Sequence, residues 1–191
     1  MSSIKLLIIT FTLLQILVSA QYCLNHEREA VGWFVILIPP QTVSKGYLYF
    51  DEDSTNFTIF EASPDVDGHP LFNTLNSISD SDYEIIVWND QLPNGSTSSS
   101  RAHSKTVVAY NEAMGTGLFI DHSMPTYPDV KNKTVNETRS SSQRVYGQHV
   151  LCFGSGEHTT ALLGRAANIN PYYYTNNNKF AFPSVSISPI L

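Results

Sequence analysis

The stretch YEIIVWND, residues 83–90, decides the fold class, because it is a short run of apolar and β-branched residues closed by polar ones. Such a run is typical of a buried β-strand. KTVVAYNE at 105–112 and GLFIDHS at 117–123 repeat the pattern, and we expect all three to be central strands. Strands with continuous apolar cores are usually covered on both faces of their sheet.

Four further runs extend this sheet. WFVILI at 33–38 is closed by a Pro-Pro pair and is expected to be a buried strand. GYLYFD at 46–51 and FTIFEA at 57–62 are expected to form a hairpin, and VYGQHVLCF at 145–153 to return as a strand. The 42% hydrophobic and 12% aromatic content suits one globular domain.

Helices and polar connections separate the predicted strands. Apolar residues at helical spacing predict a helix over 69–79, and 155–169, with Ser155 as N-cap, is predicted to be a second helix. The segments 92–101 and 129–144 have no apolar face and are expected to be loops, the first of them a flexible approach to the strand that follows.

The first twenty residues are expected to be a secretory signal peptide. Lys5 precedes an apolar run from Leu6 to Leu17, and Val18 and Ala20 fit the small-residue pattern of a cleavage site. A membrane anchor is the alternative, but the run is shorter than the roughly 20 residues that a bilayer requires. We therefore expect residues 1–20 to be removed and the mature protein to be secreted, without a membrane association.

The net charge opposes binding to a polyanion at neutral pH. The formal charge of −6 becomes −7 when Lys5 is lost with the leader, and protonating all six histidines in acid would bring it to about −1. An acidic compartment would therefore remove most of the repulsion, although only a local basic patch would attract a nucleic acid.

Cysteines and glycosylation sequons fit an oxidising compartment. Cys23 and Cys152 are the two cysteines, and they most simply pair with each other. A catalytic thiol is the alternative, but no Cys-His signature supports it. Four sequons predict a secreted glycoprotein, with acceptors at Asn56, Asn94, Asn132 and Asn136.

His103 and Lys105 form an H-x-K motif where the run at 105–112 begins. Because alternate residues of a strand share a face, the imidazole and the ammonium should project together while Ser104 points away. Hydrolysis of a phosphodiester uses such a pair, since imidazole can attack phosphorus and lysine can stabilise the charge on the nonbridging oxygens. Two solvated strand residues are the alternative, because so short a motif often arises by chance.

The motif belongs to an ordered set that comprises WFVILIPP, WNDQLP, HSKTVV, DHSMPTYP and YGQHVLC. In order and spacing this set resembles the N-terminal half of the deoxyribonuclease II family, which is related to phospholipase D. The resemblance extends from Cys23 to about Tyr174. It implies an α/β fold, a phospholipase D-like α/β/α sandwich lobe with a mixed central sheet over residues 21–175, followed by an irregular tail at 176–191.

The resemblance also implies an activity. The family hydrolyses DNA without a metal or other cofactor, as a secreted or lysosomal acid endonuclease that leaves 3′-phosphates. His103 and Lys105 match its first catalytic H-x-K pair, and His122 in DHSMP matches a further histidine near the site. A hydrogen-bonded structural histidine beside Asp121 is the alternative for His122. The two cysteines match a disulfide of the family.

The WNDQ motif at 88–91 contributes the remaining candidate residues. Asn89 and Gln91 are candidate substrate-binding residues, although the motif is also typical of a strand-end turn that supports a site. No clustered carboxylates and no Cys/His ligand spacing predict a metal site.

The chain departs from the family pattern in two respects. Thr106 follows the H-x-K motif where the family usually has glycine, and no other histidine is followed two residues later by lysine. The family carries a second H-x-K motif in a C-terminal half, because one histidine acts as nucleophile while another donates a proton. The single motif therefore predicts a homodimer that completes the site, a truncated product of a longer gene, or a non-catalytic secreted pseudoenzyme that binds nucleic acid or a host partner.

Overall fold

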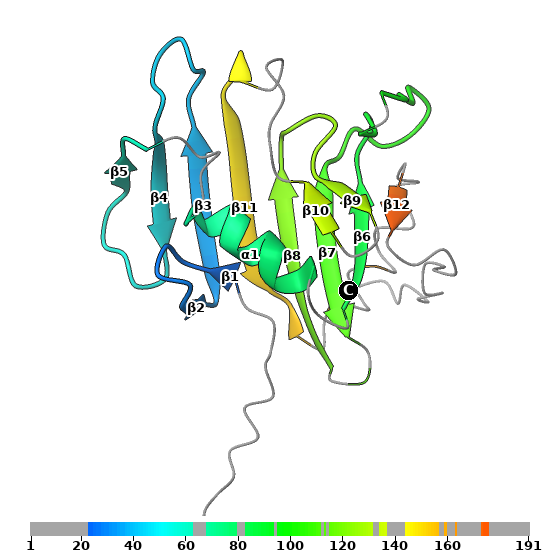
Figure 1. Cartoon of the computed structure of the whole chain (residues 1–191), viewed down its shortest axis with the longest axis horizontal. Coiled ribbons are helices and arrows are strands. Elements are labelled where there is room, and N and C mark those ends of the chain that lie inside the picture. The colour runs from blue at the N-terminus through cyan, green and yellow to red at the C-terminus, as the bar shows by residue number, and fades with distance from the viewer. Residues whose placement is uncertain are drawn as a thin grey trace, which may run out of the picture.

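An eight-stranded sheet forms the centre of the protein, as the computed structural model shows (Figure 1). The structure describes residues 23–62, 68–79, 83–93, 95–111, 113, 115–131, 134–136, 144–156, 159, 163 and 173–175. The strand order is β12-β6-β7-β8-β11-β3-β4-β5. These strands are β3 (Trp33–Ile38), β4 (Tyr47–Asp51), β5 (Thr58–Phe60), β6 (Glu84–Trp88), β7 (Thr106–Asn111), β8 (Thr116–His122), β11 (Gln148–Gly154) and β12 (Tyr173–Thr175).

Every strand pair described in this sheet is antiparallel. β3, β4 and β5 form one meander, β6, β7 and β8 form another, and β11 joins them by pairing with both β8 and β3. The expectation of a mixed sheet is therefore wrong for the described strands. Consecutive strands within each meander lie beside each other, and such neighbours return in the opposite direction because a parallel pair needs a long crossover.

Helix α1 (Pro70–Ser79) lies across one face of the sheet (Figure 1). His69 caps it, since its Nδ1 accepts a hydrogen bond of 3.2 Å from the Leu71 N–H, and Pro70 occupies the first helical position. The apolar stripe of the helix, which includes Leu75 and Ile78, is fully buried against the sheet. The helix predicted over 69–79 is thus confirmed, and it covers one face of the central strands.

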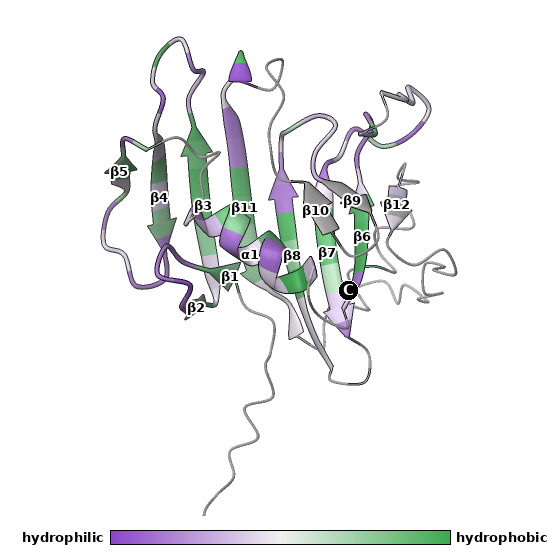
Figure 2. Ribbon diagram, viewed as in Figure 1, coloured by the Kyte–Doolittle hydropathy of each residue, from purple (hydrophilic) through white to green (hydrophobic). Residues whose placement is uncertain are grey.

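Alternating side chains give the sheet two apolar faces, and Figure 2 shows green segments along β3 and β6. Ile85 and Val87 of β6 belong to the large cluster beneath α1, whereas Ile86 and Trp88 belong to a smaller cluster on the opposite face. The burial of adjacent residues on both sides explains the unbroken apolar run that the sequence shows. Among the described residues the fold is therefore α/β, mostly strand, with α1 on one face.

Two short hairpins accompany the sheet. β1 (Cys23–Leu24) pairs with β2 (Ala30–Val31), and β9 (Asp129–Lys131) pairs with β10 (Thr134–Asn136). The expectation of a loop over 129–144 is therefore wrong for β9 and β10. A disulfide between Cys23 and Cys152 fastens the first hairpin to β11, with an S–S distance of 2.03 Å. This confirms the simplest prediction for the two cysteines.

The predicted strands and the 46–62 hairpin are confirmed, whereas several predictions concern residues that the structure does not describe. The leader at 1–20, the tail at 176–191 and most of the helix at 155–169 lie outside the described residues, as do Asn94 and Asn132. No helix within the described ranges combines the length and the apolar character needed to cross a bilayer.

Candidate active site

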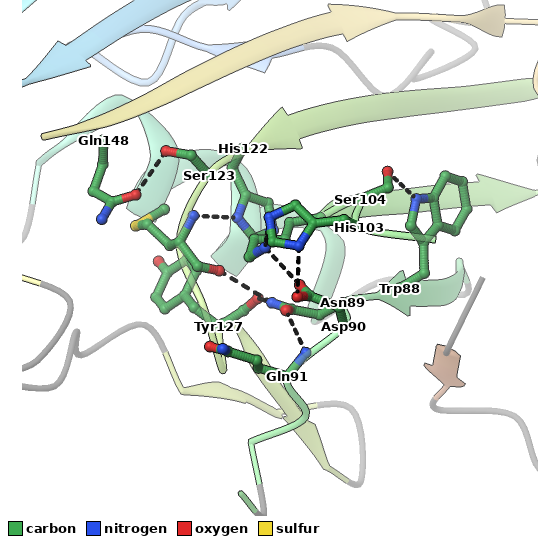
Figure 3. Close-up of polar contacts among 12 residues, drawn as sticks. Trp88, Asn89, Asp90, Gln91, His103, Ser104, His122, Ser123, Tyr127 and Gln148 are labelled. Carbon is green, nitrogen blue, oxygen red and sulfur yellow. Dashed lines mark hydrogen bonds and ion pairs between the residues drawn. The ribbon is translucent and has the colours of Figure 1, made fainter. Parts of the chain in front are cut away.

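The candidate residues meet at one end of the sheet, where β6 and β8 end and β7 begins (Figure 3). The strand register brings them together, because Thr106 pairs with Trp88 on one side and with Asp121 on the other. Residues just after β6, just before β7 and at the end of β8 are therefore neighbours. The H-x-K motif precedes β7 and does not lie within it, but the His122 N–H still donates to the Lys105 carbonyl at 3.0 Å.

Asp90 joins the two members of the H-x-K pair. Its Oδ2 lies 2.9 Å from His103 Nδ1, as the dashed line in Figure 3 shows, and its Oδ1 lies 2.5 Å from Lys105 Nζ. The two side chains thus project together, as strand alternation predicts, with one carboxylate between them. The WNDQ motif alone predicts only a strand-end turn that supports the site, so the bridging role of Asp90 does not follow from that motif. The signal in the sequence is the position of Asp90 directly after the apolar run of β6, which pairs with β7 next to the H-x-K motif.

His103 and Lys105 differ sharply in exposure. The His103 side chain is 84% exposed, whereas Lys105 is 7% exposed and the Asp90 side chain 12%. Because Nδ1 of neutral His103 donates to Asp90, the lone pair of the imidazole is on Nε2. Nε2 of the exposed His103 ring accepts a hydrogen bond of 3.4 Å from Lys105 Nζ, so the nucleophilic nitrogen lies beside the ammonium, and Asp90 compensates the charge of the buried Lys105.

Ser104 points to the opposite side of the chain. Its Oγ accepts a hydrogen bond of 3.1 Å from Trp88 Nε1, and Trp88 belongs to the apolar cluster on the face away from α1. Thr106, which replaces the glycine of the family pattern, is 1% exposed and follows the same alternation into β7. The residue between the two motif side chains thus anchors the motif to the sheet.

His122 is buried at the floor of the site, with 3% exposure. Its Nδ1 accepts a hydrogen bond of 3.2 Å from the Met124 N–H, so the neutral ring carries its proton on Nε2. Within the described part of the chain this Nε2 has no hydrogen-bond partner. Burial, followed by the charges of Lys105 and His149, lowers the pKa of His122 to about 3. His122 is therefore a neutral hydrogen-bond donor at pH 5.

The two WNDQ candidates occupy different environments. Asn89 is fully buried, and its Nδ2 donates to the carbonyls of Met124 at 3.0 Å and Tyr127 at 3.2 Å. This holds the segment that follows His122, so Asn89 occupies a supporting position away from solvent. Gln91 is half-buried and lines a cavity beside His103.

Two cavities adjoin His103. One of about 310 Å³ is lined by the H-x-K residues and His122, and also by Asp121, Ser123 and His149. His149 Nε2 lies 3.3 Å from Asp121 Oδ2. The other cavity, of about 360 Å³, lies beside the loop at 97–101. His103 lines both cavities, so the arrangement offers an accessible nucleophile with polar space on two sides.

No group of three or more His, Cys, Asp or Glu side chains able to hold a metal occurs among the described residues. The site chemistry described there includes the exposed imidazole of His103, the buried ammonium of Lys105 with its bridging carboxylate Asp90, the neutral buried imidazole of His122, and a second exposed imidazole, His149, beside Asp121. Such a set supports nucleophilic attack at an electrophile that carries negatively charged oxygens.

Similarities to known proteins extend over most of the chain. A family model described as Deoxyribonuclease II matches residues 22–187. The chain is 26% identical over 194 residues to "Cell death-related nuclease 6" of Caenorhabditis elegans, with 94% of this chain and 49% of the relative covered. It is 25% identical over 145 residues to "Plancitoxin-1" of Acanthaster planci, with 68% and 39% covered. The chain thus spans about half the length, or less, of these curated relatives.

Proposed function

The chain belongs to the deoxyribonuclease II family, and on this premise we propose that it is a lobe of an acid endonuclease that hydrolyses DNA with His103 as nucleophile. One observation carries the proposal: Asp90 holds the exposed imidazole and the buried Lys105 ammonium side by side. The two relatives are named a nuclease and a toxin, and the nuclease name supports the proposed activity.

The first chemical step follows from the geometry of the pair. Nε2 of His103 attacks phosphorus, so that a P–N bond forms while the bond from phosphorus to the 5′-oxygen breaks. Lys105 Nζ donates to this Nε2 at 3.4 Å in the unliganded site, and in the proposed step it donates instead to a nonbridging oxygen of the phosphate, which frees the Nε2 lone pair for attack. Asp90 keeps the ring oriented and stabilises the positive charge that the ring acquires.

His122 stabilises the phosphoryl group in this scheme. Its Nε2–H is a buried donor that has no partner in the described residues, and it borders the same cavity as His103. A nonbridging phosphate oxygen would satisfy this donor. Because the pKa of His122 is about 3, the residue is not the acid that protonates the leaving oxygen at pH 5.

The leaving 5′-oxygen takes its proton from a second histidine, which we assign to the H-x-K motif of a second copy of this chain. In the second step, water gives a proton to this second histidine, now deprotonated, and attacks phosphorus, so that a P–O bond forms, the P–N bond breaks and the 3′-phosphate leaves with His103 regenerated. A two-fold axis that brings two copies of His103 together would supply both roles with one motif per chain.

We further propose that the lobe is a phospholipase D-like sandwich and that the protein works in a secreted or lysosomal compartment. The two apolar faces of the sheet, one of them covered by α1, support the layered arrangement. The disulfide and the exposed acceptor Asn56 are consistent with an oxidising compartment in which Asn56 is glycosylated.

The test is nicking of plasmid DNA by the secreted protein at pH 5 in excess chelator. We expect activity to persist, to depend on protein concentration near the dissociation constant of the dimer, and to vanish in His103→Ala. DNA binding should persist in His103→Ala, because this side chain supplies a single contact. Thermal unfolding of the variant controls for loss of the fold.

Three outcomes would contradict parts of the proposal. Undiminished cleavage by His103→Ala would show that His103 is not the nucleophile. Cleavage that stops on addition of chelator would contradict the metal-independent mechanism. Full activity of a strictly monomeric preparation would contradict the assignment of the proton donor to a second copy of the chain. A wild-type protein that binds DNA at pH 5 but never cuts it would identify the non-catalytic pseudoenzyme.

A further inference from the structure

The cavity beside the 97–101 loop adjoins the site but takes no part in the chemistry above. It has a volume of about 360 Å³, and its lining combines hydroxyl groups of the loop with Arg101. His103 lines both this cavity and the one that contains Lys105 and His122. A ligand centred on His103 therefore has polar space on either side of the reacting group.

The cavity wall is built by a hydrogen-bonded loop. Gln91 and Thr97 form a β-bridge, and the Ser98 N–H donates to the Asp90 carbonyl at 3.1 Å. The Thr126 N–H donates to the Gln91 carbonyl at 3.0 Å. The composition of this segment predicts a flexible connection, but these bonds attach its described part to the residue that orients His103.

The lining chemistry selects an anion. A guanidinium is permanently charged and presents several donors in a plane, and serine and threonine hydroxyls add further donors. Both oxygens of Asp90, the carboxylate in the lining, are occupied by His103 and Lys105. Guanidinium and hydroxyl groups of this kind are common partners of nucleic-acid phosphates.

We propose that this cavity, the Arg101 subsite, binds the DNA phosphate next to the scissile phosphate, with Arg101 as its charged contact. The inference rests on the proposed function, because it takes the scissile phosphate to lie at His103. A DNA strand carries a phosphate at every nucleotide, so a strand that crosses His103 has a neighbouring phosphate on each side of the scissile one, and one of the two can enter this cavity. The subsite makes the enzyme favour substrates with more than one phosphodiester.

The experiment compares two substrates and two variants at pH 5. Thymidylyl-thymidine has one phosphodiester and cannot fill the subsite, whereas an oligothymidylate of eight nucleotides can. We expect Arg101→Gln to raise KM for the octamer by about 3- to 10-fold with kcat unchanged, and to leave kinetics with the dinucleotide unchanged. Arg28→Gln is the matched control, because Arg28 is an exposed arginine in the turn between β1 and β2.

Equilibrium binding gives a readout that does not require turnover. The binding constant K for the labelled octamer is measured by fluorescence anisotropy at several salt concentrations. In Arg101→Gln the slope of log K against log salt concentration should be smaller in magnitude than in wild type by about 0.7, as expected for one lost phosphate contact. Arg28→Gln should keep the wild-type slope.

The outcomes separate the subsite from the function on which it rests. Equal KM and equal salt slope for Arg101→Gln and wild type overturn the subsite alone. An equal loss with both substrates also overturns it, since Arg101 would then act at the scissile phosphate or through the fold. If wild type neither cuts nor binds either oligonucleotide, the proposed function fails and the subsite fails with it.

Discussion

Replacing His122 should make the protein less sensitive to acid. In the folded chain, burial and then the charges of Lys105 and His149 lower the pKa of His122 to about 3, whereas an unfolded histidine has a pKa of about 6.5. Between these two values the unfolded state binds more protons, so the free energy of unfolding decreases as the pH falls. From pH 7 to pH 5 this single residue should cost about 2 kcal/mol of stability.

The assay is urea unfolding at pH 7 and pH 5 of wild type and His122→Asn. Asparagine is uncharged at both values, and its carbonyl can accept the hydrogen bond from the Met124 N–H. We expect the variant to lose less stability than wild type over this interval, by about 2 kcal/mol, whatever its stability at pH 7. His26→Asn is a graded comparison, because partial burial also lowers the pKa of His26.

If the free energy of unfolding depends on pH in the same way in wild type and in His122→Asn, the assignment of His122 as a neutral buried imidazole is refuted. A second measurement keeps the test decisive if the variant does not fold. The ring C–H resonances of His122 in the wild-type NMR spectrum should not titrate between pH 7 and pH 4.5. A titration midpoint near pH 6 would restore His122 as a possible proton donor and contradict its role as a neutral donor.

Three further predictions concern the site and the scaffold. Asp90→Asn should reduce kcat at pH 5 by roughly 10²- to 10⁴-fold, because His103 loses its orienting acceptor, and should lower the free energy of unfolding by about 3 kcal/mol, because the buried ammonium of Lys105 loses its counter-ion. A variant that is fully active and equally stable would contradict the bridging role of Asp90. Replacing both Cys23 and Cys152 by serine should lower the free energy of unfolding by about 5 kcal/mol in the chain-entropy model, since the bridge spans 129 residues, and thiol labelling of the unreduced wild type should find neither cysteine free. Gly46→Ala should destabilise the protein by roughly 1–3 kcal/mol, because its Cβ would collide with the backbone oxygen of Phe60 in β5, whereas the Cβ of Gly147→Ala would meet nothing closer than 3.5 Å. Equal melting temperatures for the two variants would refute this packing argument.

The strands and α1 could be predicted because their signals are local. Apolar β-branched runs identify β3, β6, β7 and β8, and helical spacing identifies α1. The direction of each strand could not be predicted, because it depends on which strands become neighbours in space. β11 illustrates this, since it pairs with β3 and β8, which lie far from it in the sequence.

The site was predictable only in part, for a similar reason. Strand alternation correctly placed His103 and Lys105 on one side, because that rule needs only their spacing. The bridging role of Asp90 depends on the register between β6 and β7, and the neutrality of His122 depends on its burial in the folded chain and on the hydrogen bond from the Met124 N–H. Neither the register nor the burial is a property of a short motif.

The antiparallel meander that carries the site also bears on how the chain folds. β6, β7 and β8 pair in sequence order, so the ends that hold Asp90, His103 and His122 can meet through local hairpin formation. Pairing of β11 with β3, by contrast, must bring Cys152 to Phe34 and close a loop of most of the chain. Local contacts form faster than distant ones, because less chain entropy is lost before they are made. We expect the reacting groups to assemble early during folding, and the step sealed by the disulfide to be the slow one.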